Sequence, residues 1–286
     1  MKFYIVFMTT MLFSINVMAD ECREGVISCG ATDDGLSWEI SSIKDENGND
    51  TKQLTITGTG AMKDYTRSGD TRAPWKDYSS NGTINAAPGI TKIVIGDGIT
   101  AIGARAFEDM WNVTSVSLPD GLKSVGEEAC NGCFYLSEIN LPSSLETLAP
   151  YAFYNTQISN IDLPENLETI KWRAFGAATL LSDITIPEGV DINALAFEDE
   201  AGNACVQNVY CSGENASCQV LKNRESMAGK VQFYHSDGDA YFYNNHWYAS
   251  PNDIISDNHI KKRIYTIDEA NKVSKDNGNT FKIRYK

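Results

Sequence analysis

Apolar residues recur at a fixed interval through the middle of the chain. Between residues 90 and 197, units follow one another at steps of 23, 23, 22 and 23 residues. The units begin at Ile90, Val113, Leu136, Ile158 and Leu181. Apolar residues occupy the first, fourth and sixth positions, and proline follows the sixth in four of the five units. The alternation predicts a short strand with one face inward, which proline ends because it has no N–H to donate.

A second apolar pair and an Ala-aromatic step complete each unit. The pairs are Ile99 and Ile102, Leu122 and Val125, Leu145 and Leu148, Leu167 and Ile170, and Val190 and Ile192. The step is Ala-Phe, ending at residues 107, 153, 175 and 197, with Ala129-Cys130 as the exception. We expect both to form a return leg in which the rings fill the space between coils. Repeats of 20 to 29 residues are typical of leucine-rich repeats, whose coils bury their apolar faces only by stacking. The chain is therefore predicted to be mainly β, with a solenoid of about five to six coils of 22–23 residues.

The segments on either side of the repeats predict caps. Residues 36–40 alternate apolar and polar, residues 54–56 are strand-like, and the turn formers of 45–50 separate them. Glycine is fourth in that loop instead of sixth as an EF-hand requires, so a hairpin turn is favoured over a calcium site. After the repeats, Val206, Val209 and Cys211 predict a degenerate last coil. Aromatic segments at 231–234, 240–243 and 246–248 predict a small C-terminal β-hairpin module.

The first and last segments differ from the rest in charge and hydropathy. Lys2, an apolar run over residues 3–15 and the small residues Val17 and Ala19 predict a cleaved secretory signal. That run is shorter than the ~20 residues of a membrane span, and no later stretch is long enough. Residues 261–286 hold eight basic and three acidic residues and predict a helix followed by a strand. This basic tail is a signal read by export or anchoring machinery, a contact with anionic envelope lipid, or a hairpin docked on the acidic body. The expected divisions are 1–19, signal peptide; 20–88, N-terminal cap; 89–200, solenoid; 201–260, last coil and C-terminal cap; 261–286, tail.

Disulfides persist in oxidising compartments, so the predicted export favours disulfide bonds among the seven cysteines. We expect Cys22 to pair with Cys29 and Cys211 with Cys218, which leaves Cys205 free. Cys130 and Cys133 have the spacing of a redox motif, but they lie inside a repeat and Cys130 replaces the recurrent phenylalanine. The sequence leaves two structural alternatives for Cys130 and Cys133, a local disulfide or a pair of buried thiols.

Composition argues against several classes of function. The net charge of −14 is the opposite of what phosphate backbones require, so nucleic acid is not an expected partner. The chain has no Gly-x-Ser-x-Gly, His-Glu-x-x-His or phosphate-binding glycine motif, and its three histidines all follow residue 230. Asp237 and Asp239 flank a glycine and predict a turn more than a metal or catalytic pair. We therefore expect no enzyme activity, cofactor or metal.

The repeat unit of residues 158–175 resembles the BspA-type leucine-rich repeats of secreted and surface proteins. The strand-like segments before the repeats, at 29–30, 36–38, 54–62 and 73–75, resemble the β-rich cap that often precedes such arrays. The resemblance extends from Cys29 to Phe197. It implies a secreted or cell-envelope binding module, with adhesion to host or neighbouring-cell proteins as its usual role, and no catalytic residues.

The strand pattern also predicts which surface binds a partner. Residues on either side of each inward fourth position point outward and stack in two rows. The first row is Lys92, Ser115, Glu138, Asn160 and Asp183; the second is Val94, Ser117, Asn140, Asp162 and Thr185. Such rows are also what any solvated sheet face presents. As a binding surface, their polar members from residue 115 onward suit a basic or hydroxyl-rich protein or glycan. The alternative function is a structural envelope protein retained through the basic tail.

Overall fold

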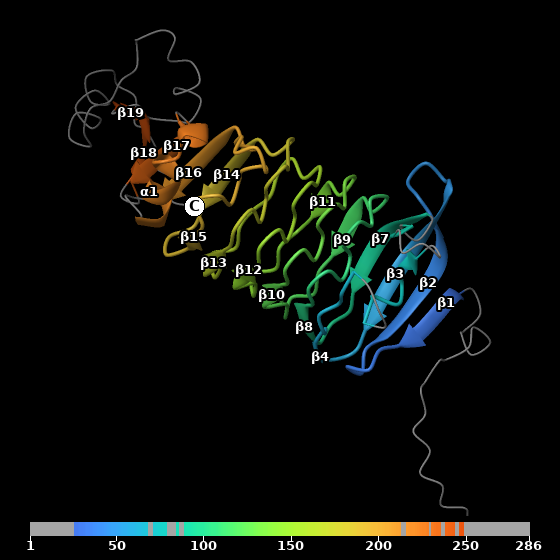
Figure 1. The fold of residues 1–286 in the computed structure, drawn as a ribbon. Helices are drawn as coiled ribbons and strands as arrows, with labels where there is room; N and C mark the ends of the chain where they lie inside the picture. The colour runs from blue at the N-terminus through green and yellow to red at the C-terminus, as the bar shows by residue number, and fades with distance from the viewer. Residues whose placement is uncertain are drawn as a thin grey trace, which may run out of the picture.

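The computed structural model describes residues 26–67, 71–78, 84–85, 89–212, 216–228, 230–235, 238–243 and 246–248. They form an elongated stack of coils with the N-terminal strands at one end and the C-terminal strands at the other (Figure 1). The chain is mainly β, as predicted. The predicted signal, Cys22, the Asp237 turn residue and the basic tail lie outside the described residues.

The N-terminal cap continues directly into the solenoid. Strands β1 (Val26–Ala31), β2 (Ser37–Lys44) and β3 (Asp50–Thr57) are antiparallel, and β3 then pairs in parallel with β7 (Ile90–Ile95). The predicted hairpin is confirmed, since Lys44 faces Asp50 and the Asp45 carboxylate accepts hydrogen bonds from the backbone N–H groups of Asn47 and Asn49. Short strands β5 (Asp77–Tyr78) and β6 (Ile84–Asn85) also pair in this region.

Two parallel sheets run along the coils. The first continues from β7 to β9 (Ser115–Ser117) and β11 (Glu138–Ile139). The second contains β4 (Gly60–Ala61), β8 (Ile99–Ile102), β10 (Ser124–Val125), β12 (Thr147–Leu148), β13 (Thr169–Ile170) and β15 (Asp191–Ile192). The second apolar pair therefore belongs to a sheet, and only the Ala-aromatic step belongs to the return leg. The buried residue of each short strand pairs in register with that of the next coil, from Ile102 to Ile192.

The predicted strand at 158–163 is not formed. The first sheet stops at β11, and a separate sheet begins at β14 (Asp183–Ile186). The coil nevertheless stays stacked, because the Gln157 N–H donates to Leu136 O over 3.0 Å and Ile158 is fully buried. The connection that enters this coil is one residue shorter than the preceding one, which is consistent with a local loss of ladder geometry.

An aromatic column runs through the core. The rings of Phe153 and Phe175 are 5.7 Å apart, and those of Phe175 and Phe197 are 5.9 Å apart, both stacked. At the other end, Trp75 of the cap lies 5.9 Å from Phe107. The recurrent phenylalanines therefore fill the space between coils, as predicted, and the cap extends the column.

Cys130 occupies the gap in that column as a buried free thiol, and Cys133 beside it is also buried and free. The disulfide expected as one alternative for this pair is wrong. Both side chains point into the packed interior, and the Cys133 thiol donates to Phe107 O over 3.1 Å, so its polar group is satisfied without a bridge. Burial raises the pKa of Cys133 well above its ordinary value, which argues against a reactive thiolate.

The C-terminal end closes the stack. Strand β16 (Asn208–Ser212) pairs with β14 so that Val209 faces Ile184 and Cys211 faces Ile186, which confirms the degenerate coil. Helix α1 (Ala216–Lys222) and the short helix η2 (Glu225–Met227) follow, and neither was predicted. Strands β17 (Val231–His235), β18 (Gly238–Tyr243) and β19 (His246–Tyr248) form the expected antiparallel module. Cys211 is joined to Cys218 of α1, the pairing expected from the sequence, and Cys205 is free.

Candidate partner-binding face

The two polar rows lie on the outside of the first sheet, of the coil at 158–163 and of the separate sheet that begins at β14. Ser115 pairs in register with Lys92 on one side and Glu138 on the other. The residues that follow them in the strands, such as Val116 and Ile139, are buried. Because alternate residues of a strand point to opposite faces, the flanking side chains project outward. Adjacent members of a row belong to coils spaced about 4.8 Å apart.

Exposure of the predicted site residues follows this geometry. Most of them are exposed, and only Ser115 is half-buried. The exposed members are Ser117, Glu138, Asn140, Asn160, Asp162, Asp183 and Thr185. The structure thus gathers the rows on one side of the solenoid, although the coil at 158–163 separates β11 from β14.

The side chains of the rows differ in how they are held. Asn208 Nδ2 donates to Asp183 Oδ1 over 2.7 Å, and Ser182 Oγ lies 3.4 Å from Asn160 Oδ1. By contrast, no hydrogen bond or ion pair to another described residue holds the Glu138 side chain. The same is true of Asp162 within the described residues. These two carboxylates are therefore available to a partner's positive or hydrogen-bonding groups.

A hydroxyl column runs beside the rows, and the sequence reasoning missed it. It consists of Thr51, Thr91, Thr114, Ser137, Ser159 and Ser182. The hydroxyls of Thr51 and Thr91 lie 2.8 Å apart, and Thr114 Oγ1 donates to Thr91 O over 3.2 Å. The signal was present in the sequence, because Ser or Thr occupies the second position of all five units.

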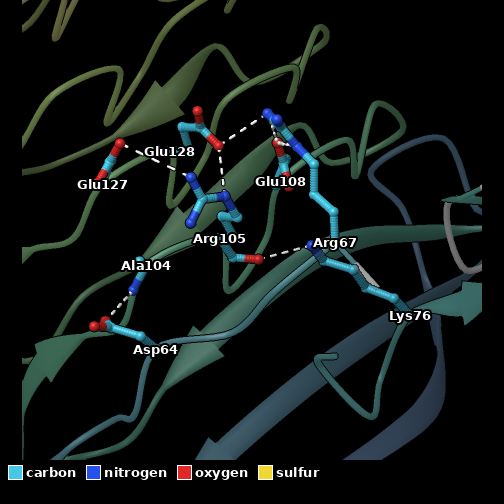
Figure 2. A network of polar contacts seen from close by, with 8 residues as sticks. All are labelled: Asp64, Arg67, Lys76, Ala104, Arg105, Glu108, Glu127 and Glu128. Atoms are coloured by element: carbon cyan, nitrogen blue, oxygen red, sulfur yellow. Dashed lines mark hydrogen bonds and ion pairs between the residues drawn. The ribbon is translucent and has the colours of Figure 1, made fainter. Parts of the chain in front are cut away.

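A separate charged network joins the cap to the first two coils (Figure 2). Arg67 bonds Glu108 through Nε over 2.7 Å and Glu128 through Nη2 over 2.9 Å, while Arg105 Nε lies 2.7 Å from Glu128. Lys76 Nζ donates to the backbone oxygen of Arg105 over 2.7 Å. These contacts link residues that are far apart in the sequence, and this network fixes the cap.

Burial shapes the ionisation of this network. It raises the pKa of Glu108, against the lowering effect of Arg67, and it lowers the pKa of Lys76 to about 8. Both groups are tied to protein partners, Glu108 to Arg67 and Lys76 to the backbone oxygen of Arg105. Their position favours a structural role over acid–base chemistry.

A polar hollow of about 460 Å³ lies at the junction of the last coil and the C-terminal cap. Its lining includes Asn203, Asn223, Arg224, Ser226 and Lys230. The hydroxyl of Ser226 donates to the buried Glu198 carboxylate, whose pKa is lowered first by its hydrogen bond to Arg224. Neither Ser226 nor Glu198 is poised there as a nucleophile or a base.

The described residues show neither a metal-binding cluster nor a membrane-spanning helix. No group of three or more His, Cys, Asp or Glu side chains comes together there in a way that could hold a metal ion. Within the same ranges, no helix has the length and apolar character needed to cross a bilayer.

Stacked coils of 22–23 residues with a buried aromatic column and in-register parallel strands define a leucine-rich-repeat solenoid. Residues 83–202 match the family described as "BspA type Leucine rich repeat region", in six copies. The chain therefore carries a BspA-type leucine-rich repeat region, as the repeat unit indicated. No curated protein matches the chain.

Several solved structures similar to this chain are leucine-rich repeat proteins. The T. pallidum leucine-rich repeat protein is 20% identical, with 60% of this chain and 68% of that chain covered and a TM-score of 0.39. A leucine-rich repeat protein from Bacteroides ovatus is 19% identical, with 60% and 48% covered and a TM-score of 0.40. A leucine-rich cell surface protein from Faecalibacterium prausnitzii is 19% identical, with 63% and 54% covered and a TM-score of 0.34. The match spans about half the length of the last two proteins.

Proposed function

We propose that this protein is a non-catalytic binding module that acts outside the cytoplasm and recognises a protein or glycan through the two polar rows. The observation that carries the proposal is the set of polar side chains on one face from Ser115 to Thr185, most of them exposed. It includes the carboxylates of Glu138 and Asp162, to which no other described residue is hydrogen-bonded or ion-paired. Export is supported by the sequence pattern of residues 1–19.

The solenoid suits this role because its backbone is already ordered. The rows stand on strands and coils whose inward residues, such as Val116 and Ile184, are buried. A partner that docks there meets a surface whose spacing is preset, so less conformational entropy is lost on binding. The carboxylates of Glu138, Asp162 and Asp183 give this surface a negative charge that favours basic or hydroxyl-rich groups.

Charge reversal on the rows tests the proposal. We expect the variant with Glu138→Lys, Asp162→Lys and Asp183→Lys, made in the protein lacking residues 1–19, to capture much less partner from envelope and host extracts. A matched control reverses Asp120, Glu165 and Glu188, which are also exposed but lie after the prolines that end the strands.

The two variants carry the same change in net charge. Equal loss of capture by both would contradict the proposal, because overall charge would then explain the binding. Unchanged capture by the row variant would contradict it as well. Melting temperatures near that of the unmodified protein show that any loss of capture is not caused by unfolding.

A further inference from the structure

We propose that the partner contributes an extended basic peptide segment, in which a large apolar side chain and a Lys or Arg lie two to four residues apart. The inference rests on the proposed function and names the class of ligand for the same face. It is carried by an aromatic shelf, which consists of Trp111, Phe134 and Tyr135, located beside the exposed carboxylate of Glu138.

The shelf brings three exposed aromatic side chains to adjacent coils of a solenoid that otherwise buries most of its aromatic rings. Trp111 is 49% exposed, Phe134 42% and Tyr135 46%. The rings of Phe134 and Tyr135 meet edge to face at 5.1 Å, and the Tyr135 N–H donates to Trp111 O over 3.2 Å. The backbone hydrogen bond therefore holds the segments that carry these rings side by side before any ligand arrives.

The shelf lies directly beside the acidic part of the rows. Tyr135 precedes Glu138 by three residues, so their Cα atoms are at most about 11 Å apart. Between them, the exposed hydroxyls of Thr114 and Ser137 continue the hydroxyl column. The face thus changes over a short distance from apolar to hydroxyl to acidic.

An extended peptide matches this sequence of surfaces. Its side chains on one face recur every second residue, at about 6.6 Å. One apolar side chain can then contact the shelf while a Lys or Arg two to four residues away reaches Glu138. The same cation also gains from an exposed indole, because ammonium and guanidinium groups interact favourably with the face of Trp.

Charge favours a basic peptide over two other occupants, a glycan and a second copy of this chain. The hydroxyls of a neutral glycan can donate to the Glu138 carboxylate but supply no counter-charge, and an anionic glycan would be repelled by a chain whose net charge is −14. A second copy of this chain would bring another acidic face toward Glu138. A basic peptide alone satisfies both the apolar shelf and the neighbouring carboxylate.

Selection from a linear peptide library displayed on phage tests the inference with the protein lacking residues 1–19. We expect enriched peptides to combine a large apolar residue with Lys or Arg at a separation of two to four residues. A synthetic peptide of the enriched sequence then serves as the probe in fluorescence anisotropy. Trp111→Ser and Phe134→Ser are each expected to weaken its affinity about tenfold or more, and Glu138→Gln should weaken it and reduce its dependence on salt.

The matched controls are Trp172→Ser and Leu180→Ser, since these side chains are 40% and 51% exposed outside the shelf. They should leave the affinity unchanged. Failure to enrich basic-apolar peptides overturns the inference, and so does probe binding that the shelf variants do not weaken. A dimer detected by sedimentation and abolished by Trp111→Ser would overturn it in favour of a second copy.

The failure of this inference is distinguishable from failure of the proposed function. If charge reversal on the rows abolishes partner capture but the shelf variants do not affect it, the rows bind a partner of another chemistry. If neither set affects capture, both proposals fail.

Discussion

Replacement of Arg224 with Met should show how much the contact between Arg224 and Glu198, which joins the last coil to the C-terminal cap, contributes to stability. The Glu198 carboxylate is fully buried and accepts hydrogen bonds from Arg224 Nε at 2.9 Å and Nη2 at 2.8 Å. Ser226 Oγ donates to the same carboxylate over 2.5 Å. Removal of the guanidinium leaves a buried charge with only one of its side-chain partners.

The size of the effect follows from burial. Removal of one partner from a fully buried ion pair costs about 3–5 kcal/mol. The Arg224 side chain is 42% exposed, so solvent screens part of the interaction, and we expect about 2 kcal/mol of lost stability. For a domain of this size that corresponds to a fall in melting temperature of about 4–8 °C.

The dependence on pH has a definite sign. The pKa of Glu198 is lowered first by the hydrogen bond from Arg224 and then by Ser226, while burial opposes them. A carboxylate with a lowered pKa stabilises the fold above its unfolded pKa, and this contribution is lost as pH falls through the folded pKa. The difference in free energy of unfolding between the unmodified protein and Arg224→Met should therefore be largest at pH 7 and should shrink below about pH 4.

Urea denaturation followed by circular dichroism at pH 7 and pH 3 measures both effects. The control is Lys123→Met, because the pair of Lys123 with Glu146 is exposed on both sides and should contribute less than about 1 kcal/mol. A loss of under about 0.5 kcal/mol in Arg224→Met at pH 7 would refute the reasoning. A gap that stays constant between the two pH values would refute it too.

Three further changes test other parts of the account. Phe175→Ala should cost about 3–5 kcal/mol in urea denaturation, because the ring is fully buried between two stacked neighbours; a cost below about 1 kcal/mol would contradict the aromatic column. Cys218→Ala should cost about 2 kcal/mol by opening a short disulfide loop, and addition of reductant should remove the difference from the unmodified protein. Deletion of residues 261–286 should release the protein from cells into the medium, with ligand binding intact, if the basic tail retains it at the envelope. Unchanged fractionation would count against that role.

The repeat itself was predictable because each coil buries the same positions. Inward residues such as Ile93, Val116 and Ile139 recur at intervals of 23 residues, so the strand pattern and the outward rows follow from one alternation. The second sheet was not recognised, because strands such as Thr147–Leu148 contain two residues and show no alternation. The step of 22 residues before Ile158 is visible in the sequence, but the coil at 158–163 keeps the same apolar positions as its neighbours, so the pattern does not show that its strand is missing.

Contacts between segments that are distant in the sequence could not be predicted, for a different reason. Arg67 and Glu108 lie 41 residues apart, and no repeat relates the cap to the first coil. The free thiol of Cys133 depends on its closeness to Phe107 O, which only the folded coil establishes. Trp111 and Phe134 of the aromatic shelf are evident in the sequence, but the sequence does not distinguish these exposed rings from the buried phenylalanines.

Site-specific photo-crosslinking tests the central claim that the polar rows bind a partner. A photoreactive phenylalanine replaces Asn140 on the rows or Glu168, which directly precedes β13 of the second sheet; both residues are exposed. The two proteins are irradiated with the same envelope and host extracts. The account predicts a crosslinked partner from position 140, displaced by excess unmodified protein, and little from position 168. Equal crosslinking at the two positions, or crosslinking that is stronger at 168, would contradict it.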